Sequence, residues 1–429
     1  MNQSPSTPDA SNRENSCANT RATNDSLHSL RVVVIGAGVA GCSAAIHLAR
    51  RGASVTLIES KPFPRVKVCG EYVSPAATDD LECLLDAAAL RSLGARRVDR
   101  FGVIVQGASG TRRIEWLTPV SAWALSRGSL DTALLEAADS TGVTRLQPVT
   151  VRSVAYANDG VTVTLVDGTH IDTDIVVHAD GTGRHDTGAG SSIDRASRPT
   201  PAIQGLIGLK CHARLPHDQH HASSVEMRAG NGVYAGSVLV EDGLATIALC
   251  AHTDVLRALK GDHDAVLERA WPGWNRAWRE GDWLACPVPR SRYIKPSHAR
   301  SFRVGNAAAA IDPVGGEGIG NALWSGRVLA NALAKSLTLS PAQADSKSES
   351  VRFTTDHKAS LSTAHVTIAH AYARRLRTRL PACQLAAFGL MRPSLMRLIW
   401  PLLRFPSLTL RPWYRLTGKP NRQTNPANQ

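Results

Sequence analysis

The chain has 429 residues, of which 43% are hydrophobic and 20% charged, and a formal net charge of +13. This length exceeds what one hydrophobic core usually fills, so two lobes and an appendage are expected. No run of 18 apolar residues occurs, which argues against a membrane-spanning helix. The eight cysteines form neither a C-x-x-C pair nor a Cys/His cluster with zinc-ligand spacing, so no metal site is expected.

Residues 1–30 differ in composition from the rest of the chain. They are rich in Ser, Asn, Thr and Asp and have no apolar periodicity, which is typical of a disordered leader. They also lack the apolar core of a secretory signal. The scattered cysteines are interpreted as buried side chains in a reducing compartment. We therefore expect a cytoplasmic protein.

The first ordered stretch predicts a strand, a turn, a helix and a second strand. The β-branched run 31–35 is typical of a strand buried on both faces of a parallel sheet. Residues 36–41 form a glycine-rich turn, residues 42–51 have the pattern of a helix, and residues 53–59 predict a strand that ends in an acidic residue. This order is the context in which a G-x-G-x-x-G turn becomes informative.

The three glycines of this turn have separate physical tasks. Gly36 allows the tight exit from the strand, and Gly38 lets the backbone approach a pyrophosphate at the start of the helix. Gly41 permits close packing of helix on strand, and Glu59, 18 positions later, is placed to accept hydrogen bonds from an adenosine ribose. The stretch predicts a dinucleotide site and leaves NAD and FAD open.

Two later stretches favour FAD. Residues 175–183 form a strand that runs into a small-residue turn containing Asp180 and Gly181. Residues 302–308 form a strand and polar turn, and the glycine-dense loop 313–321 opens a helix predicted over 322–337. Backbone N–H groups at such a helix start suit the negatively charged pyrimidine edge of a reduced flavin.

With these motifs the chain resembles the flavoprotein superfamily that contains the aromatic-ring hydroxylases and the geranylgeranyl reductases. The resemblance covers roughly residues 31–340. Residues 126–131 resemble the R-x-x-L-D helix start of the family, and residues 65–75 resemble the K-x-C-G-E-x-x-S-P segment of its reductase-like branch. The resemblance implies FAD as the cofactor. Because no second complete dinucleotide fingerprint occurs, NADPH or NADH is expected to bind only transiently as reductant.

The resemblance and the motifs together nominate a set of cofactor-binding residues. The set is Gly36, Gly38, Gly41, Glu59, Lys67, Arg127, Asp180, Gly181, Gly305, Asn306, Gly316, Gly318 and Ile319. The family usually has Asp at the position of Asn306, where the carboxylate accepts a hydrogen bond from a ribityl hydroxyl. An amide oxygen can still accept that bond but carries no charge. A redox-inactive binding protein that keeps the fold is therefore an alternative.

No catalytic residue is assigned from the sequence. Glu71 and Glu317 are candidate proton donors, and Cys69 is interpreted as a packed thiol rather than a reactive one. The expected fold is α/β: a Rossmann-type FAD-binding lobe with a parallel sheet, a mostly antiparallel substrate lobe, and a helical C-terminal region. The expected boundaries are 31–95, 126–200 and 290–340 for the FAD-binding domain, 96–125 and 201–289 for the substrate domain, and 341–429 for the basic C-terminal region.

Two flavin reactions remain open at this point, acting on a hydrophobic or aromatic small molecule. One is monooxygenation, and the other is reduction of a carbon–carbon double bond, including prenyl-lipid reduction at a membrane surface. Residues 232–243 lack the W-x-F-P pattern of archaeal prenyl reductases. Residues 271–274 do not match the W-x-W-x-I-P motif of flavin halogenases, so Trp271 and Trp274 are expected to pack in a core.

The positive charge is largely arginine, and much of it lies beyond residue 370. It lacks a Lys-rich run interleaved with aromatics, so no nucleic-acid partner is expected. Residues 371–380 and 395–410 predict helical segments. They are interpreted either as a cap on the flavin lobe with solvated arginines or as a peripheral membrane contact.

Overall fold

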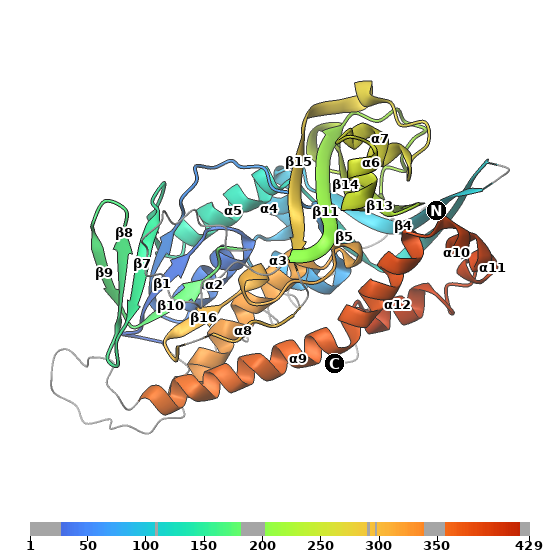
Figure 1. The fold of residues 1–429 in the computed structure, drawn as a ribbon. Helices are drawn as coiled ribbons and strands as arrows, with labels where there is room; N and C mark the ends of the chain where they lie inside the picture. Colours follow the sequence, from blue (N-terminus) through green and yellow to red (C-terminus); the bar gives the residue numbers. More distant parts are fainter. Residues whose placement is uncertain are drawn as a thin grey trace, which may run out of the picture.

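The computed structural model describes residues 27–107, 110–181, 202–289, 292–296, 298–338 and 357–420. Figure 1 shows a parallel sheet with its helices at one end, a larger curled sheet at the other, and C-terminal helices running beneath both. Residues 1–26 of the predicted leader and the predicted loop at 341–350 lie outside the described residues.

A five-stranded parallel sheet, here called sheet A, has the strand order β16-β10-β1-β2-β6. Its strands are β1 (Arg31–Ile35), β2 (Ser54–Ile58), β6 (Thr144–Leu146), β10 (Ile175–His178) and β16 (Ser301–Arg303). Central β1 places Val33 opposite both Val176 and Thr56. The predicted strand 31–35 is confirmed. Its β-branched side chains are buried because strands or helices cover both faces.

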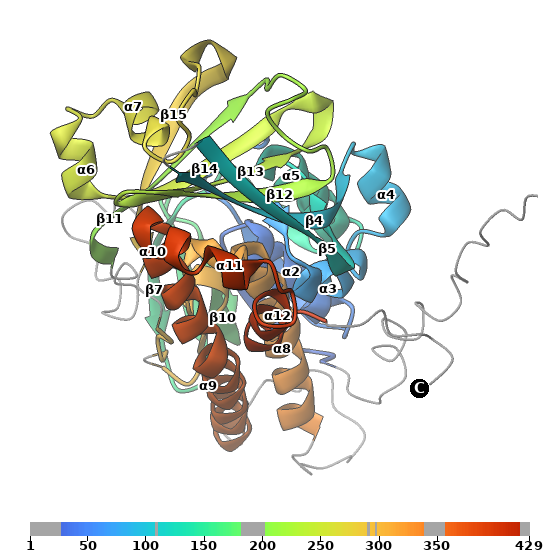
Figure 2. The ribbon, with the colours of Figure 1, turned by 90° about the vertical axis from the view of Figure 1, so that its right-hand side faces the viewer.

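Helices α2 and α8 pack directly on each other beside sheet A (Figure 2). The buried Ser43 hydroxyl on α2 donates a 2.8 Å hydrogen bond to the Leu323 carbonyl on α8. α8 begins four residues before its predicted start at 322, because the glycines of the preceding loop already belong to its first turn. The helices of this lobe are α2 (Val39–Ala49), α3 (Thr78–Glu82), α4 (Ala87–Ser92), α5 (Arg127–Asp139) and α8 (Gly318–Thr338).

A small antiparallel sheet, β7 (Val151–Tyr156), β8 (Val161–Leu165) and β9 (His170–Thr173), packs its apolar side chains against sheet A. The last four residues of the predicted leader also belong to the fold. Leu27 and Leu30 are 2% and 1% exposed, and the Leu27 amide donates to the Arg51 carbonyl at 2.7 Å. The predicted leader boundary at residue 30 is therefore wrong, because these two isolated leucines carry no periodic signal.

An eight-stranded sheet, here called sheet B, has the order β15-β11-β14-β13-β12-β4-β5-β3. All neighbours are antiparallel except β4 and β12, so the expected mostly antiparallel sheet is confirmed. Its strands are β3 (Tyr72–Val73), β4 (Arg96–Gly107), β5 (Gly110–Ala124), β11 (Ala202–Ala213), β12 (Ser224–Gly230), β13 (Val233–Leu239), β14 (Ala245–His252) and β15 (Arg279–Pro289).

A second core lies under sheet B, beside α6 (Thr253–Ala258) and α7 (His263–Glu268). Trp271 and Trp274 are buried there, with ring centroids 5.7 Å apart. The core-packing interpretation of these tryptophans is confirmed.

The C-terminal region consists of α9 (His357–Leu390), α10 (Pro393–Leu398), α11 (Trp400–Leu403) and α12 (Leu410–Leu416). The long α9 runs beside α8 and reaches sheet B at β12 and β13 (Figures 1 and 2). Arg374 and Arg377 are exposed on this helix, whereas Arg375 and Arg379 have only 9% and 10% of their side chains exposed. The region packs on the body of the protein, and its arginines are only partly solvated. No helix within the described ranges is long and apolar enough to cross a membrane.

Candidate functional site

The three sequence stretches expected to form one site meet at the carboxyl ends of neighbouring strands of sheet A. A Cβ added to Gly36 would lie 2.7 Å from the Ala179 carbonyl oxygen, beside Asp180 and Gly181. A Cβ added to Gly305 would lie 2.6 Å from Ala40 in the first turn of α2. The ends of β1, β10 and β16 and the start of α2 therefore form one continuous surface.

The first glycine turn needs glycine for reasons the geometry makes explicit. Gly36 has a φ of +101°, which L side chains rarely adopt. A Cβ on Gly41 would lie 1.8 Å from the Gly36 carbonyl oxygen, a backbone atom that cannot move aside. The turn thus brings the start of α2 close against the strand, as the sequence predicted.

Three basic side chains surround Gly38 at the N-terminus of α2. A Cβ built on Gly38 would lie 3.5 Å from Arg65 Nη2, 3.6 Å from Lys67 Nζ and 4.0 Å from Arg127 Nη2. Gly38 is the N-cap of α2 and offers no side-chain cap to the free amides of the first turn. Positive charge from the side chains and from the helix end therefore converges on one point, which suits a diphosphate.

Two buried carboxylates hold the arginines of this cradle in place. Arg127 forms a bidentate pair with Asp131, with both N–O distances 2.7 Å. Arg65 donates from Nη1 to Glu59 at 3.0 Å, and its Nε lies 3.9 Å from Asp131 Oδ2. The two carboxylates thus hold Arg65 with its Nη2 directed at the Gly38 cradle.

Glu59, predicted to accept from a ribose, is buried at the end of β2. Its Oε2 accepts from the Ala37 amide at 2.9 Å, and its Oε1 accepts from the Lys61 amide at 2.9 Å. The carboxylate thus lies against the glycine turn itself. Arg65 was missed by the sequence analysis, although its spacing of two from Lys67 in an extended segment gives a signal that both point the same way.

The surroundings of Lys67 disfavour the charged form of its ammonium group. Burial and the positive charges of Arg127 and Arg65 lower the pKa of its ammonium group to about 8. A bound diphosphate would add opposite charge next to it and raise that pKa again.

We therefore expect the dissociation constant for FAD to rise with pH above about 8, by roughly tenfold between pH 8 and 9.5. Below pH 8 Lys67 is protonated in both the free and the FAD-bound protein, so affinity is flat there. Calorimetric titration of apoprotein with FAD at several pH values measures this. Lys67→Arg should abolish the dependence, and identical profiles for wild type and Lys67→Arg would refute it.

The second helix start, at α8, is open and its loop is tightly fixed. Gly316 has a φ of +62°, and nothing lies within 4 Å of a Cβ built on Gly318. Ile319 is buried beneath this opening. The exposed amides at α8 therefore present a second partial positive charge, as expected for the pyrimidine edge of a flavin.

Glu317 lies in this loop and is fully buried among cations from the C-terminal helices. Lys419 donates to its Oε1 at 2.6 Å, Arg379 donates to its Oε2 at 3.2 Å, and Arg375 lies 3.8 Å away. Burial alone would raise the pKa of Glu317, but the charges of Lys419 and Arg379 outweigh it and lower that pKa. The C-terminal region thus fixes the loop through a buried ion cluster that the sequence analysis missed.

Glu71, from the C-G-E segment, links the two lobes. It is fully buried with a φ of +54°. Its Oε1 accepts from the Arg127 amide at 2.7 Å and from buried Lys210, and its Oε2 accepts from His212 at 2.7 Å and from Thr246. Lys210, His212 and Thr246 lie on sheet B, so one carboxylate joins that sheet to the start of α5.

Burial would raise the pKa of Glu71, but the His212 hydrogen bond and the charge of Lys210 lower it from 4.5 to about 2. Both Glu71 and Glu317 are therefore ionised near neutral pH. This charge state does not support either carboxyl group as the proton donor considered from the sequence.

The lowered pKa makes a prediction about stability. Glu71 contributes about 3 kcal/mol that is fully present above pH 5 and is lost as pH falls from about 4.5 to about 2. We expect the unfolding free energy of wild type minus that of Glu71→Gln to shrink by about 2 kcal/mol between pH 5 and pH 3. Urea unfolding at pH 7, 5, 4 and 3 tests it. A pH-independent difference would contradict the ionised state of Glu71.

The remaining nominated residues occupy the same surface. Asp180 and Gly181 follow β10, and Gly181 has a φ of +75°. Asn306 is half-buried in a short 3-10 turn, Gly305–Ala307, next to the start of α2. Cys69 lies near Arg127, and its Sγ accepts a 3.4 Å hydrogen bond from the Glu71 amide. Within the described ranges, no cluster of three or more His, Cys, Asp or Glu is placed to hold a metal.

The comparisons with known proteins agree with this geometry. Residues 31–67 match the family model described as FAD dependent oxidoreductase. The menaquinone reductase of Mycobacterium tuberculosis is 28% identical over 325 residues, covering 70% of this chain and 76% of its own. The digeranylgeranylglycerophospholipid reductase of Sulfolobus acidocaldarius is 50% identical over 52 residues, which is 12% of each chain.

A solved structure described as a probable FAD-dependent monooxygenase from Pseudomonas aeruginosa has a TM-score of 0.63 and 17% identity, covering 87% of this chain and 99% of its own. At this identity it shows the fold alone. The fold and the assembled site define an FAD-dependent oxidoreductase. The chain is similar to members of the flavoprotein superfamily that contains the aromatic-ring hydroxylases and the geranylgeranyl reductases.

Proposed function

We propose that the protein reduces a carbon–carbon double bond in the prenyl chain of a hydrophobic molecule, such as a quinone, with NADPH or NADH as reductant. The observation that carries this proposal is the similarity to a menaquinone reductase along 70% of the chain. The shorter similarity to a digeranylgeranylglycerophospholipid reductase supports it, because both named substrates contain prenyl chains.

The proposed roles of the chain follow from the positions of its side chains. Arg65, Lys67 and Arg127 bind the diphosphate above Gly38, and Glu59 binds the adenosine ribose. When reduced, FAD supplies the two electrons that saturate the double bond.

The start of α8 would hold the flavin edge through the backbone of Gly316, Gly318 and Ile319. The amide oxygen of Asn306 would accept a hydrogen bond from a ribityl hydroxyl. Glu317 keeps the α8 loop in place through Lys419 and Arg379. Glu71 holds sheet B against the start of α5 through its hydrogen bond with the Arg127 amide. Because both carboxylates stay ionised, the proton added to the second carbon comes from another group or from water.

The test is a single turnover without oxygen. FAD-loaded protein is reduced with NADPH or NADH and mixed with a short-chain menaquinone, and the product is exposed to air before mass spectrometry. Reduction of the prenyl chain leaves a gain of two hydrogens that survives air, whereas reduction of only the quinone ring reverses. Unchanged substrate mass after air would contradict the proposal.

A parallel reaction in air distinguishes monooxygenation from reduction of the double bond. A product that gains one oxygen atom, with no gain of two hydrogens in the anaerobic reaction, would identify a monooxygenase instead. Omitting NADPH and NADH and reducing the flavin chemically shows whether failure lies with the reductant or with the substrate.

A further inference from the structure

The segment from the end of α10 through α11 to the start of α12 exposes an unusual number of large apolar side chains. Eleven large hydrophobic side chains are exposed in the described residues, and seven of them lie between 385 and 416. Four fall within eleven consecutive residues, here called the apolar turn: Leu398, Leu402, Phe405 and Leu408, which are 76%, 54%, 56% and 62% exposed. A cluster of this kind marks an interaction surface.

The apolar turn is anchored to the body of the protein. Met396 and Trp400 are 6% and 5% exposed and pack into the main core. Arg397 donates to the Gln106 carbonyl at 3.3 Å, which ties α10 to the end of β4. Figure 1 places this turn at one end of the molecule, next to the tip of the β4–β5 hairpin. The exposed side chains are therefore presented outward by a fixed segment.

The charge around the apolar turn has one sign. Residues 357–420 contain eleven lysines and arginines and no aspartate or glutamate. Arg397, Arg404 and Arg411 are exposed within or beside the apolar turn. Apolar side chains interspersed with unopposed arginines complement the boundary between headgroups and acyl chains of an anionic bilayer.

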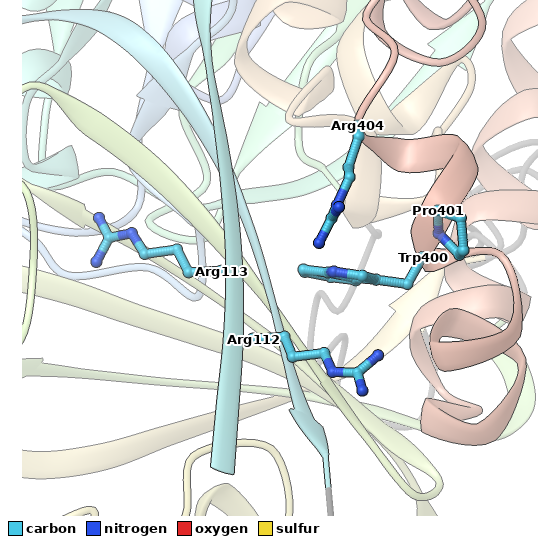
Figure 3. Close-up of a pocket in the computed structure, with 5 residues that line it drawn as sticks. All are labelled: Arg112, Arg113, Trp400, Pro401 and Arg404. Atoms are coloured by element: carbon cyan, nitrogen blue, oxygen red, sulfur yellow. The ribbon is translucent and has the colours of Figure 1, made fainter. Parts of the chain in front are cut away.

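A pocket between the apolar turn and β5 adds a second observation. It has a volume of about 450 Å³ and is lined by Arg112, Arg113, Trp400, Pro401 and Arg404. In Figure 3 the Arg112 and Arg404 guanidinium groups extend on either side of the Trp400 ring, whereas Arg113 points to the other side of its strand. Arg113 is paired with Glu226 at 2.6 Å and Glu115 at 3.3 Å.

Arg112 and Arg404 have no carboxylate partner among the described residues, so the pocket presents two uncompensated guanidinium groups. Guanidinium groups bind phosphate oxygens with directional, charge-assisted hydrogen bonds. The pocket therefore has the chemistry of a site for a phosphate monoanion or diester.

We propose that the apolar turn docks on an anionic phospholipid bilayer, with Leu402 and Phe405 inserted at the headgroup boundary and lipid phosphates bound by Arg112 and Arg404 on the two sides of the Trp400 ring. A second copy of this chain fits less well, because a twofold contact would bring the same unpaired arginines face to face. The proposal holds whether the protein reduces or oxygenates its substrate.

Binding of the FAD-loaded, full-length protein to vesicles tests the proposal. Deleting the C-terminal region is unsuitable, because buried Trp400, Tyr414 and Lys419 would be lost with it. We therefore compare Arg112→Gln/Arg404→Gln and Leu402→Ser/Phe405→Ser with two matched controls. Arg91→Gln removes an exposed arginine elsewhere, and Val366→Ser removes an apolar side chain that is 55% exposed near the far end of α9.

Wild type should co-sediment with vesicles of phosphatidylcholine and phosphatidylglycerol at least tenfold more strongly than with phosphatidylcholine alone. Arg112→Gln/Arg404→Gln should lose binding roughly 30-fold, as expected for two basic residues near an anionic surface. Leu402→Ser/Phe405→Ser should lose at least roughly 30-fold, because two large apolar side chains no longer enter the bilayer, while both controls bind as wild type. An unchanged flavin spectrum shows that the variants are folded.

Equal binding to both vesicle types, or no loss in the double variants, would overturn the proposal. Sedimentation velocity without vesicles measures the oligomeric state and tests the alternative that the apolar turn joins two copies of the chain. A dimer that Leu402→Ser/Phe405→Ser converts to monomer would show that the apolar turn is an interface between copies of this chain.

Discussion

Gly38→Asp should abolish FAD binding while leaving the protein folded. The new carboxylate would occupy the space bordered by Arg65, Lys67 and Arg127 and would neutralise the charges that a diphosphate needs. Loss of two or more charge-assisted hydrogen bonds, each of about 1.5–3 kcal/mol, predicts an affinity at least roughly 100-fold weaker. Fluorescence titration of apoprotein with FAD measures the change.

The thermal stability of the apoprotein is the control for this variant. Gly38 is the N-cap of α2 with a φ of −74°, so Asp or Ala fits the backbone, and Asp is a favourable N-cap. Apoprotein carrying Gly38→Asp should thus melt no lower than wild-type apoprotein. Gly38→Ala should bind FAD with intermediate affinity. Wild-type affinity in Gly38→Asp would show that the diphosphate lies elsewhere.

Glu317→Gln should destabilise the folded protein by about 3–5 kcal/mol, because it leaves Lys419, Arg379 and Arg375 buried without their shared carboxylate. The amide has nearly the same shape, so lost packing contributes little. Chemical unfolding of apoprotein isolates this effect from any change in FAD affinity.

A double-mutant cycle distinguishes the ion cluster from a general loss of stability. Lys419→Met alone should cost less than Glu317→Gln, because Arg379 remains within 3.2 Å of the carboxylate. In the Glu317→Gln background, Lys419→Met should recover part of the loss, since one unpaired cation is removed. Strictly additive effects, or a change below about 0.5 kcal/mol for Glu317→Gln, would mean that the cluster does not fix the flavin loop.

The features that the sequence predicted correctly are those that short, local residue patterns indicate. β1 follows from a run of β-branched residues, and the glycine turn follows from the tight approach of Gly41 to Gly36. The joining of three distant stretches was predictable because parallel strands bring their carboxyl ends to one edge of the sheet. The start of α8 was misplaced because glycines 318 and 320 resemble loop residues by composition.

The features that the sequence did not reveal depend on contacts between distant residues. Glu317 meets Arg379 and Lys419 across 62 and 102 positions, and Glu71 meets Lys210 across 139. None of these pairs belongs to a periodic or motif-like pattern, so only the packed fold identifies them. The same holds for the charge state of the two candidate proton donors, because the cations that lower both pKa values come from other elements.

The central claim is that the Gly36–Gly41 turn, the Asp180 turn and the Gly305–Ile319 segment form one FAD site. The most direct measurement is the absorbance spectrum of the purified protein, followed by extraction and mass identification of the bound cofactor. The account predicts a yellow protein that releases close to one FAD per chain, either as purified or after incubation with FAD. A protein that stays colourless after incubation with FAD would contradict it and would favour a redox-inactive binding protein with Asn306 in place of the usual carboxylate.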